Sequence, residues 1–178
     1  MQEFEPQVVS GASDQTIRTW DLATGKRVKV LTNHKKSIRS MIFHHEEYTF
    51  CSAGGDNLKV WKCPEARFLR NFSGHKTIIN SLALNEDNVL VSAGDNGSLY
   101  FWDWKSGYNF QRIMSRPQPG SIASEAGIFS AKFDRSGLRL ITCECDKTIK
   151  IWCEDEEATP SSHPIDPNYR GFMKARQS

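Results

Sequence analysis

The sequence predicts an all-β fold, and three observations support this prediction. Tryptophan recurs at a nearly regular spacing, at Trp20, Trp61, Trp102 and Trp152. Apolar and polar residues alternate before each tryptophan, which is typical of a strand with one buried face. Residues that favour tight turns separate these stretches, and residues 1–153 show no long amphipathic helical pattern.

The tryptophan spacing also defines an internal repeat. Successive tryptophans lie 41, 41 and 50 residues apart. Repeats of about 40 to 45 residues are typical of β-propellers, in which each repeat supplies the strands of a four-stranded antiparallel blade. The longer third interval predicts an insertion of about nine residues between Met114 and Ala126, in the last blade.

Strand and turn signals follow one another along the whole repeat region. Four strand-rich segments each end one residue after a tryptophan, and they are residues 8–21, 50–62, 89–103 and 140–153. Turn segments rich in small and polar residues lie between the strands, at residues 23–25, 86–88, 105–107 and 135–137. The order of these signals fits a four-stranded meander in each blade.

The strand count predicts a propeller whose ring is not closed. The first recognisable strand, Val8 to Ala12, corresponds to the second strand of a blade. Counting onward gives three strands of a first blade, two complete blades and three strands of a last blade that ends near Cys153. We therefore expect residues 1–153 to form about three to four blades of an expected seven, as the C-terminal half of a longer protein. Residues 154–178 are expected to form a polar, flexible tail.

Polar residues recur at fixed positions of the repeats. A serine or threonine, an aspartate or asparagine and the tryptophan occur in every repeat, and a histidine precedes them in two repeats. This pattern resembles the WD40 family, in which these side chains form a buried hydrogen-bonded tetrad. The resemblance implies that the tetrad positions are Ser10, Asp14, Trp20, His34, Ser52, Asp56, Trp61, His75, Ser92, Asn96, Trp102, Thr142, Asp146 and Trp152.

The tetrads depart from the WD40 pattern in three places. Asn96 occupies the usual aspartate position of the third repeat, with Asp95 beside it. The turn of the second repeat is one residue short, which leaves the position of Asp56 open by one residue, and the first and last repeats lack the histidine. An imidazole between a carboxylate and a hydroxyl satisfies buried polar groups that would otherwise each cost about 1 to 3 kcal/mol, so the role expected of these residues is structural.

Several segments that depart from the WD40 consensus are informative about function. They are residues 31–39, 95–97, 101–112, 118–121, 124–129 and 146–164. Together they resemble the pleiotropic regulator family, the spliceosomal WD40 subunits of the NineTeen complex, from about Val8 to Pro164. The resemblance implies a nuclear, non-catalytic scaffold in pre-mRNA splicing. Its partners would be other proteins of that complex, with at most weak or indirect RNA contact.

A second function is implied by plant members of the same family. They resemble substrate receptors of a cullin-type ubiquitin ligase, which use a Trp-Asp-x-Arg motif. The nearest match here runs from Trp102 to Lys105, with lysine in place of arginine. An ammonium group lacks the planar fork of a guanidinium, so this replacement weakens the alternative.

The insertion is the first candidate contact surface. Long surface loops of a propeller commonly carry binding specificity, which singles out Gln118, Pro119, Gly120 and Ser121. The alternative is a loop that only covers a neighbouring blade.

Four further residues are candidates for interaction. Lys35 and Lys36 follow His34 and could meet an acidic partner or an RNA phosphate, whereas a solvated charge pair is the structural alternative. Trp104 and Lys105 belong to the possible ligase motif. Strand alternation nevertheless predicts that most aromatic residues of this stretch are packing residues.

Composition and motifs exclude several classes of function. The chain has 23 Lys and Arg against 21 Asp and Glu, so its formal charge of +2 gives no strong attraction to nucleic acid or membrane. It shows no signal-peptide pattern and no apolar run of about 18 residues, from which we expect a soluble protein of the cytosol or nucleus. No GxSxG, HExxH, P-loop or GxGxxG motif occurs, so we predict no enzyme, no cofactor and no small-molecule substrate.

The cysteines predict buried free thiols in a reducing compartment. Five cysteines, an odd number, lie in apolar, strand-like segments, at Cys51, Cys63, Cys143, Cys145 and Cys153. A metal site that combines the last three with His163 is the alternative. Cys143 and Cys145 lack the C-x₂₋₄-C spacing of structural zinc, so we predict no metal.

Overall fold

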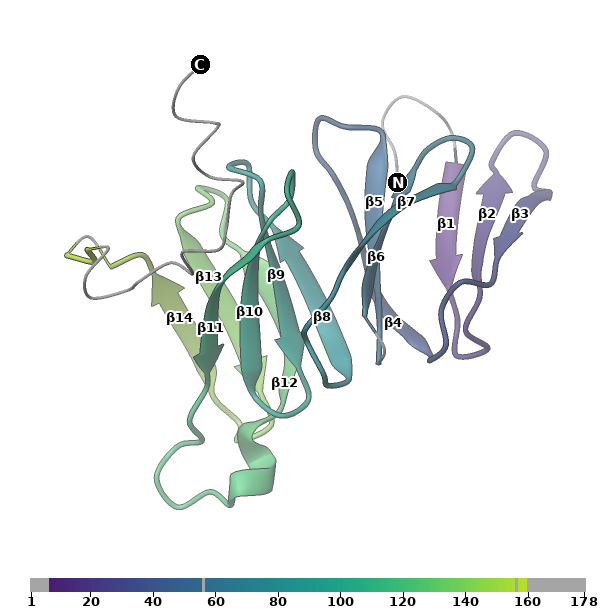
Figure 1. Ribbon diagram of the computed structural model, residues 1–178. Coiled ribbons are helices and arrows are strands. Elements are labelled where there is room, and N and C mark those ends of the chain that lie inside the picture. Colours follow the sequence, from purple (N-terminus) through teal and green to yellow (C-terminus); the bar gives the residue numbers. More distant parts are fainter. Residues whose placement is uncertain (1–6, 56, 156, 160–178) are drawn as a thin grey trace.

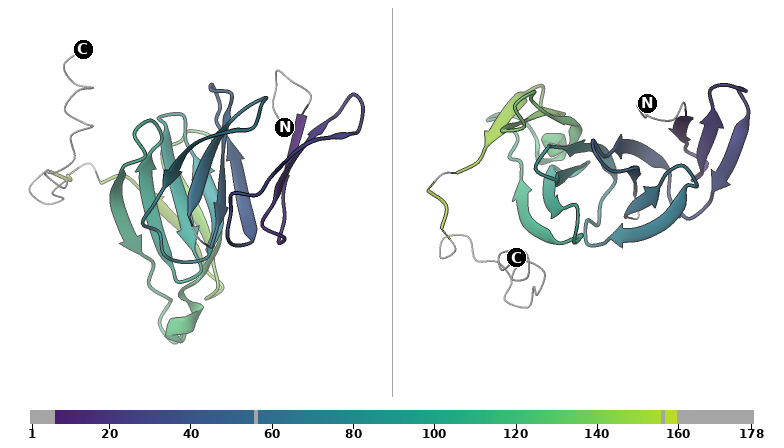
Figure 2. Two further views of the ribbon diagram at one scale, coloured as in Figure 1. Left: turned by 45° about the vertical axis from the view of Figure 1, so that its right-hand side comes forward. Right: turned by 90° about the horizontal axis from the view of Figure 1, so that it is seen from above.

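The computed structural model describes residues 7–55, 57–155 and 157–159 (Figure 1). Within these residues, fourteen strands form four antiparallel sheets, and every strand pairs only with its neighbours in sequence. One short 3-10 helix lies between the third and fourth sheets in the chain. Seen from above in Figure 2, the sheets stand side by side along an open arc. No helix in the described part of the chain has the length and hydropathy to cross a membrane. We call the sheets the first to fourth blades, in chain order.

The blades contain three, four, four and three strands. The first blade consists of β1 (Gln7–Gly11), β2 (Ile17–Asp21) and β3 (Arg27–Leu31). The second consists of β4 (Ile38–Phe43), β5 (Thr49–Gly54), β6 (Leu58–Lys62) and β7 (Arg67–Phe72). The third consists of β8 (Ile79–Leu84), β9 (Val89–Gly94), β10 (Ser98–Asp103) and β11 (Asn109–Met114). The fourth consists of β12 (Ile128–Phe133), β13 (Arg139–Glu144) and β14 (Ile149–Cys153), and the 3-10 helix η1 (Ala123–Ala126) precedes it.

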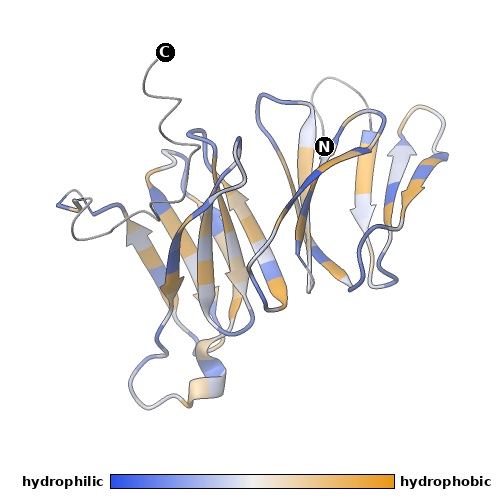
Figure 3. Ribbon diagram, in the orientation of Figure 1, coloured by the Kyte–Doolittle hydropathy of each residue, from blue (hydrophilic) through white to orange (hydrophobic). Residues whose placement is uncertain are grey.

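This arrangement confirms the predicted all-β, incomplete propeller. The strands alternate hydrophobic and hydrophilic residues, as the colours of Figure 3 show. The predicted turns at 23–25, 86–88, 105–107 and 135–137 fall between strands, and the predicted insertion separates β11 from β12. In the part of the chain that the structure describes, the ring is open, because no further sheet lies beside the outer side of the first or the fourth blade.

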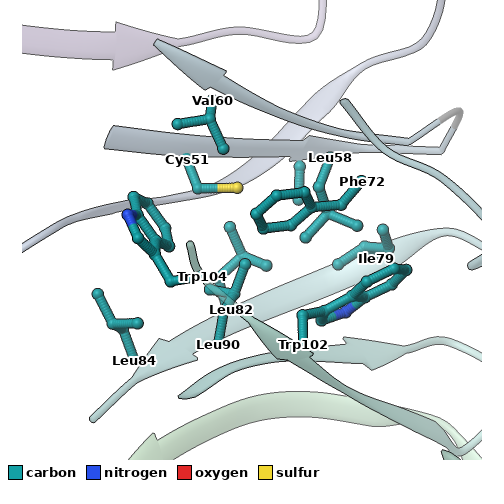
Figure 4. Packing of buried hydrophobic residues seen from close by; sticks show 11 residues of the cluster. Cys51, Leu58, Val60, Phe72, Ile79, Leu82, Leu84, Leu90, Trp102 and Trp104 are labelled. Atoms are coloured by element: carbon teal, nitrogen blue, oxygen red, sulfur yellow. The ribbon is translucent and has the colours of Figure 1, made fainter. Parts of the chain in front are cut away.

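Hydrophobic cores fill the spaces between neighbouring blades. The innermost strands β4, β8 and β12 lie next to one another, so the second, third and fourth blades pack face to face. Between the second and third blades, Phe72 stacks on Trp102 with ring centroids 5.7 Å apart and meets Trp104 edge-on (Figure 4). Smaller aliphatic side chains complete this core. With three buried aromatic residues, it is the most aromatic of the cores between blades.

The fourth blade leaves an apolar face uncovered. On β14, Ile149 is 70% exposed and Ile151 is 66% exposed, although strand alternation would place them in a core. Cys143 and Cys153 are exposed in the same blade and Cys145 is partly exposed, so the prediction of buried thiols is wrong for these three and right for Cys51 and Cys63. The pattern alone could not reveal that no sheet covers this face.

Candidate interaction face and tetrad sites

The tetrad turns and the loops that enter each blade gather at one end of the sheets. Backbone hydrogen bonds join them: Ile38 N–H donates to the carbonyl of Ala12, and Asp95 N–H donates to that of Ile78. This end, the lower end in Figure 1, also carries the insertion and η1. We call it the insertion face, formed by residues 12–16, 33–37, 73–78, 94–97, 115–127 and 144–148.

The third blade contains a continuous hydrogen-bonded chain. Trp102 Nε1–H donates to Ser92 Oγ over 2.9 Å, and Ser92 Oγ lies 2.8 Å from His75 Nδ1. On its other side, His75 Nε2 lies 2.7 Å from Ser98 Oγ, whose hydroxyl donates to Asn96 Oδ1 over 2.5 Å. Asn96 therefore does not contact the imidazole directly, and Ser98 stands between them. This departs from the predicted tetrad, in which the imidazole contacts the residue at position 96 directly.

The hydrogen bonds also assign the tautomer of His75. Because the Ser98 hydroxyl donates to Asn96, the bond with Nε2 is formed by donation from Nε2–H to Ser98 Oγ. Nδ1 then accepts from the hydroxyl of Ser92. Burial, with a smaller contribution from the charge of Arg112, lowers the pKa of His75 to about 4. The ring is therefore neutral at physiological pH, and it stacks on Tyr100 with centroids 4.0 Å apart.

The second blade repeats the inner half of this chain. Trp61 Nε1–H donates to Ser52 Oγ over 2.8 Å, and His34 Nε2 lies 2.7 Å from the same oxygen. All three side chains are buried. Asp56, the remaining predicted member, lies outside the described residues. The structure thus brings together three predicted residues that are 9 and 18 positions apart in sequence.

The first blade contains only the tryptophan–serine pair. Trp20 Nε1–H donates to Ser10 Oγ over 2.9 Å. Asp14 is exposed and accepts hydrogen bonds from the backbone N–H and the hydroxyl of Thr16. It also forms an ion pair with Arg18. The bonds from Thr16, followed by those from Arg18, lower the pKa of Asp14 to about 2. Asp14 shapes its turn and does not join the pair, contrary to the tetrad prediction.

The fourth blade replaces the histidine with a buried ionic cluster. Trp152 Nε1–H donates to Thr142 Oγ1 over 3.0 Å, and the Thr142 hydroxyl donates to Glu144 Oε1 over 3.0 Å. The carboxylate of Glu144, whose side chain is 0% exposed, lies 2.6 Å from Lys150 Nζ. It also accepts from the Ser115 hydroxyl at 2.7 and 2.6 Å. Glu144, Lys150 and Ser115 were not predicted as site residues.

Asp146 connects the insertion to the fourth blade. Its carboxylate accepts from the hydroxyl of Thr148 at 2.5 Å and from the backbone N–H of Gln118 at 2.8 Å. The side chain of Gln118 returns a bond to the carbonyl of Asp146 over 2.7 Å. These bonds, led by that of Thr148, lower the pKa of Asp146. The predicted tetrad aspartate thus serves as an anchor for the loop.

The insertion is fixed at both ends and projects at its tip. At its start, Ser115 N–H donates to the carbonyl of Gly97, and at its end Cys145 N–H donates to that of Gly127, both over 2.8 Å. Gly97 has φ +83°, and a Cβ there would lie 2.6 Å from the Ala126 carbonyl oxygen, so only glycine fits this contact. Between the anchors, Pro119 and Gly120 are exposed and Ser121 is half-buried.

The remaining candidate interaction residues divide into exposed and buried ones. Lys35 and Lys36 are exposed on the insertion face, and Lys105 is exposed at the opposite end of the blades. Trp104 is 0% exposed and donates through Nε1–H to Glu47 Oε2 over 3.2 Å. Its prediction as an interaction residue is wrong, because it belongs to the core between the second and third blades.

Two signals in the sequence could have identified the cluster of the fourth blade. Glu144 stands two residues after Thr142, where Gly54 and Gly94 follow Ser52 and Ser92 at the same spacing. A charged residue that replaces a repeated glycine, in a repeat without histidine, indicates a compensating change. In the described residues, no group of three or more His, Cys, Asp or Glu side chains is arranged to hold a metal ion, and His163 lies outside them.

Comparison with known proteins identifies the repeats and their relatives. A model of the family described as "WD domain, G-beta repeat" matches residues 25–62, 66–103 and 118–153. The chain is 54% identical over 142 residues to Protein pleiotropic regulator PRL2 of Arabidopsis thaliana, covering 79% of this chain and 30% of the relative. It is 55% identical to Pleiotropic regulator 1 of Mus musculus, covering 71% of this chain and 25% of the relative.

A fungal relative carries a name that states its process. The chain is 45% identical over 141 residues to Pre-mRNA-splicing factor PRP46 of Candida glabrata, covering 79% of this chain and 33% of the relative. The chain thus spans between a quarter and a third of the length of these three relatives.

Proposed function

Because this chain belongs to the WD repeat family, we propose that it is a non-catalytic, protein-binding scaffold that acts in pre-mRNA splicing in the nucleus. One observation carries the proposal. Sequence identity of 45% or more extends over most of this chain to proteins named pleiotropic regulator and pre-mRNA-splicing factor. The partners in this proposal are other proteins of the splicing NineTeen complex.

The use of the polar side chains supports a scaffold. His75, Glu144 and Asp146 are buried and form hydrogen bonds within or next to their own blade. A general base or nucleophile needs a position from which it reaches a substrate, whereas these buried groups bind partners within the protein. Their arrangement fixes the blades and the loops that the blades present.

The insertion supports the choice of contact surface. A loop that is anchored at both ends loses little conformational entropy when it binds, so its exposed tip suits recognition of a partner protein. Ile122, next to the tip, is 65% exposed and offers an apolar contact. The surface that we propose comprises Pro119, Gly120, Ser121 and Ile122.

An affinity purification from nuclear extract tests the proposal. The tagged chain is expected to recover proteins of the splicing complex, and replacement of residues 119–122 by a Gly-Ser linker is expected to reduce that recovery. A matched variant carries the linker at residues 135–137, a turn at the other end of the fourth blade. Recovery of no splicing proteins by the unmodified chain would refute the function, and equal recovery by both variants would refute the surface.

The ubiquitin-ligase alternative gains no support. Of the residues in its possible motif, Trp102 and Trp104 are buried in a core. The relatives described above are named for splicing or pleiotropic regulation.

A further inference from the structure

A groove opens between the second and third blades on the insertion face. Its volume is about 320 Å³, and its lining consists of Lys36, Ser37, Arg39, Gly55, Thr77 and Ile78. The first four residues come from the second blade and the loop that enters it, and the last two come from the loop that enters the third. The groove therefore depends on the packing of two blades and not on a single turn.

Arg39 is held at the rim by the neighbouring blade. Its guanidinium donates to Asn80 Oδ1 over 3.0 Å. The amide of Asn80 in turn donates to the carboxylate of Asp95 and to the carbonyl of Ile128, both over 3.0 Å. This series of bonds crosses from the second to the fourth blade and positions the guanidinium before any ligand arrives.

The positive charges of the groove are not neutralised by the rest of the described chain. No described carboxylate lies within ion-pair distance of Lys36 or Arg39. Lys76 is exposed beside the groove and adds positive charge. Among the described residues, Asp95 takes part in this series of bonds, and its carboxylate accepts from the amide of Asn80.

The groove also has an apolar lining residue beside its charged ones. Ile78 lines the groove and is 41% exposed, so its side chain offers an apolar contact to a ligand there. The described residues that line the groove include no aromatic side chain, whereas single-stranded RNA is commonly bound by stacking of its bases on aromatic rings. Lys36 and Arg39 with Ile78 therefore match a protein segment better than an RNA strand.

We propose that this groove binds an acidic, extended segment of a partner protein. A carboxylate of the segment sits between Lys36 and Arg39, and a neighbouring aliphatic side chain packs on Ile78. The fork of an arginine favours bidentate contact with a carboxylate, and the lysine adds a second charge. This contact is separate from the tip of the insertion, so it holds whether or not the tip binds splicing proteins.

Fluorescence anisotropy with the whole chain tests the groove. The probe is a labelled peptide in which glutamate and leucine alternate, compared with the peptide in which glutamine replaces glutamate and with a uridine-rich RNA of equal charge. We expect the acidic peptide to bind at least about tenfold more tightly than either comparison ligand, and added salt to weaken it. Tighter binding of the RNA, or equal binding of the glutamine peptide, would overturn the proposal.

Variants that add negative charge to the groove test where the peptide binds. Lys36→Glu and Ile78→Asp, both at exposed positions, are each expected to weaken peptide binding at least about tenfold. The matched control, Lys62→Glu with Arg67→Glu, reverses charges at the opposite end of the second blade, where both residues are exposed. Circular dichroism verifies that each variant is folded. An equal loss of affinity in the control shows general charge attraction and rejects the groove.

Discussion

The third and fourth blades satisfy the equivalent tryptophan, buried as Trp102 and partly buried as Trp152, with different chemistry. In the third blade, Trp102 donates to Ser92, which bonds a neutral His75. In the fourth blade, Trp152 donates to Thr142, which bonds the carboxylate of Glu144. The tryptophan–hydroxyl bond is thus common to both blades, while the group behind it changes from a neutral ring to an ion pair.

The change involves several positions at once. Gly94 in the third blade corresponds to Glu144, and a Cβ at Gly94 would lie 2.5 Å from Thr77 Cγ2 and 2.8 Å from Ser98 Oγ. Tyr100, on which the imidazole stacks, corresponds to Lys150, since both precede their tryptophan by two residues. A side chain at position 94 of the third blade would therefore collide with Thr77 and Ser98, whereas the fourth blade accommodates Glu144 at the equivalent position. The tetrad is better described as a set of hydrogen-bonding positions than as a set of residue types.

The largest effect is expected from breaking the ion pair of the fourth blade. Lys150→Met leaves the buried carboxylate of Glu144 without its counter-ion and should lower the free energy of unfolding by about 3 kcal/mol. Urea denaturation measures this change. Lys132→Met, at an exposed position of the same blade, is the control and should change little. The double variant Glu144→Leu with Lys150→Met should recover most of the loss, and failure to recover would show that packing of the lysine stem is the cause.

The second effect is a loss of stability on acidification that belongs to the third blade. The folded-state pKa of His75 is about 4, below its ordinary value near 6.5. As the pH falls below about 6.5, the unfolded chain takes up a proton that the folded chain does not, so this histidine should reduce stability by about 2 kcal/mol at pH 5. Urea denaturation at pH 7 and pH 5 measures the difference, which His75→Gln should remove. The same difference in that variant would assign the effect elsewhere.

Sequence reasoning succeeded where the pattern is local. The tryptophans, the hydroxyl partners and the strand alternation repeat at fixed spacing, and each predicted pair formed, as Trp20 with Ser10 shows. It failed where the outcome depends on a neighbouring sheet. Trp104 follows the end of β10, and only the packing of the second blade shows that it is buried. Cys143 and Cys153 read as core residues, but their face has no covering sheet.

The network behind the hydroxyls was harder to predict than the hydroxyls themselves. Glu144 and Ser115 are 29 residues apart, and the bond between them depends on how the insertion folds back on the fourth blade. Ser98 was overlooked because a hydroxyl two residues after Asn96 is common in turns, and nothing in the sequence shows that it contacts His75. In both cases the hydrogen bond could be identified only from the three-dimensional structure.

A third, smaller effect distinguishes the two blades at equivalent turn positions. Ser98 and Thr148 each precede the blade tryptophan by four residues, but only Ser98 contacts a histidine. Ser98→Ala leaves the Nε2–H of His75 buried without this acceptor and should cost about 1 to 2 kcal/mol. Thr148→Ala removes one donor from the carboxylate of Asp146, which still accepts from the backbone N–H groups of Thr148 and Gln118, and should cost about 0.5 kcal/mol. Equal losses by urea denaturation would mean that the histidine does not depend on Ser98.

The smallest effect on stability comes from restoring the usual aspartate of the third blade. Asn96→Asp keeps an acceptor for the Ser98 hydroxyl and should change the free energy of unfolding at pH 7 by less than about 1 kcal/mol. Its negative charge should nevertheless raise the pKa of His75, because a nearby carboxylate favours the imidazolium. A higher folded-state pKa narrows the gap to the unfolded value, so the loss of stability between pH 7 and pH 5 should shrink. Titration of the His75 ring protons by NMR measures the pKa directly. Asp95→Asn alters the neighbouring charge outside the hydrogen-bonded chain, and a shift of equal size there would show that the coupling does not pass through Ser98.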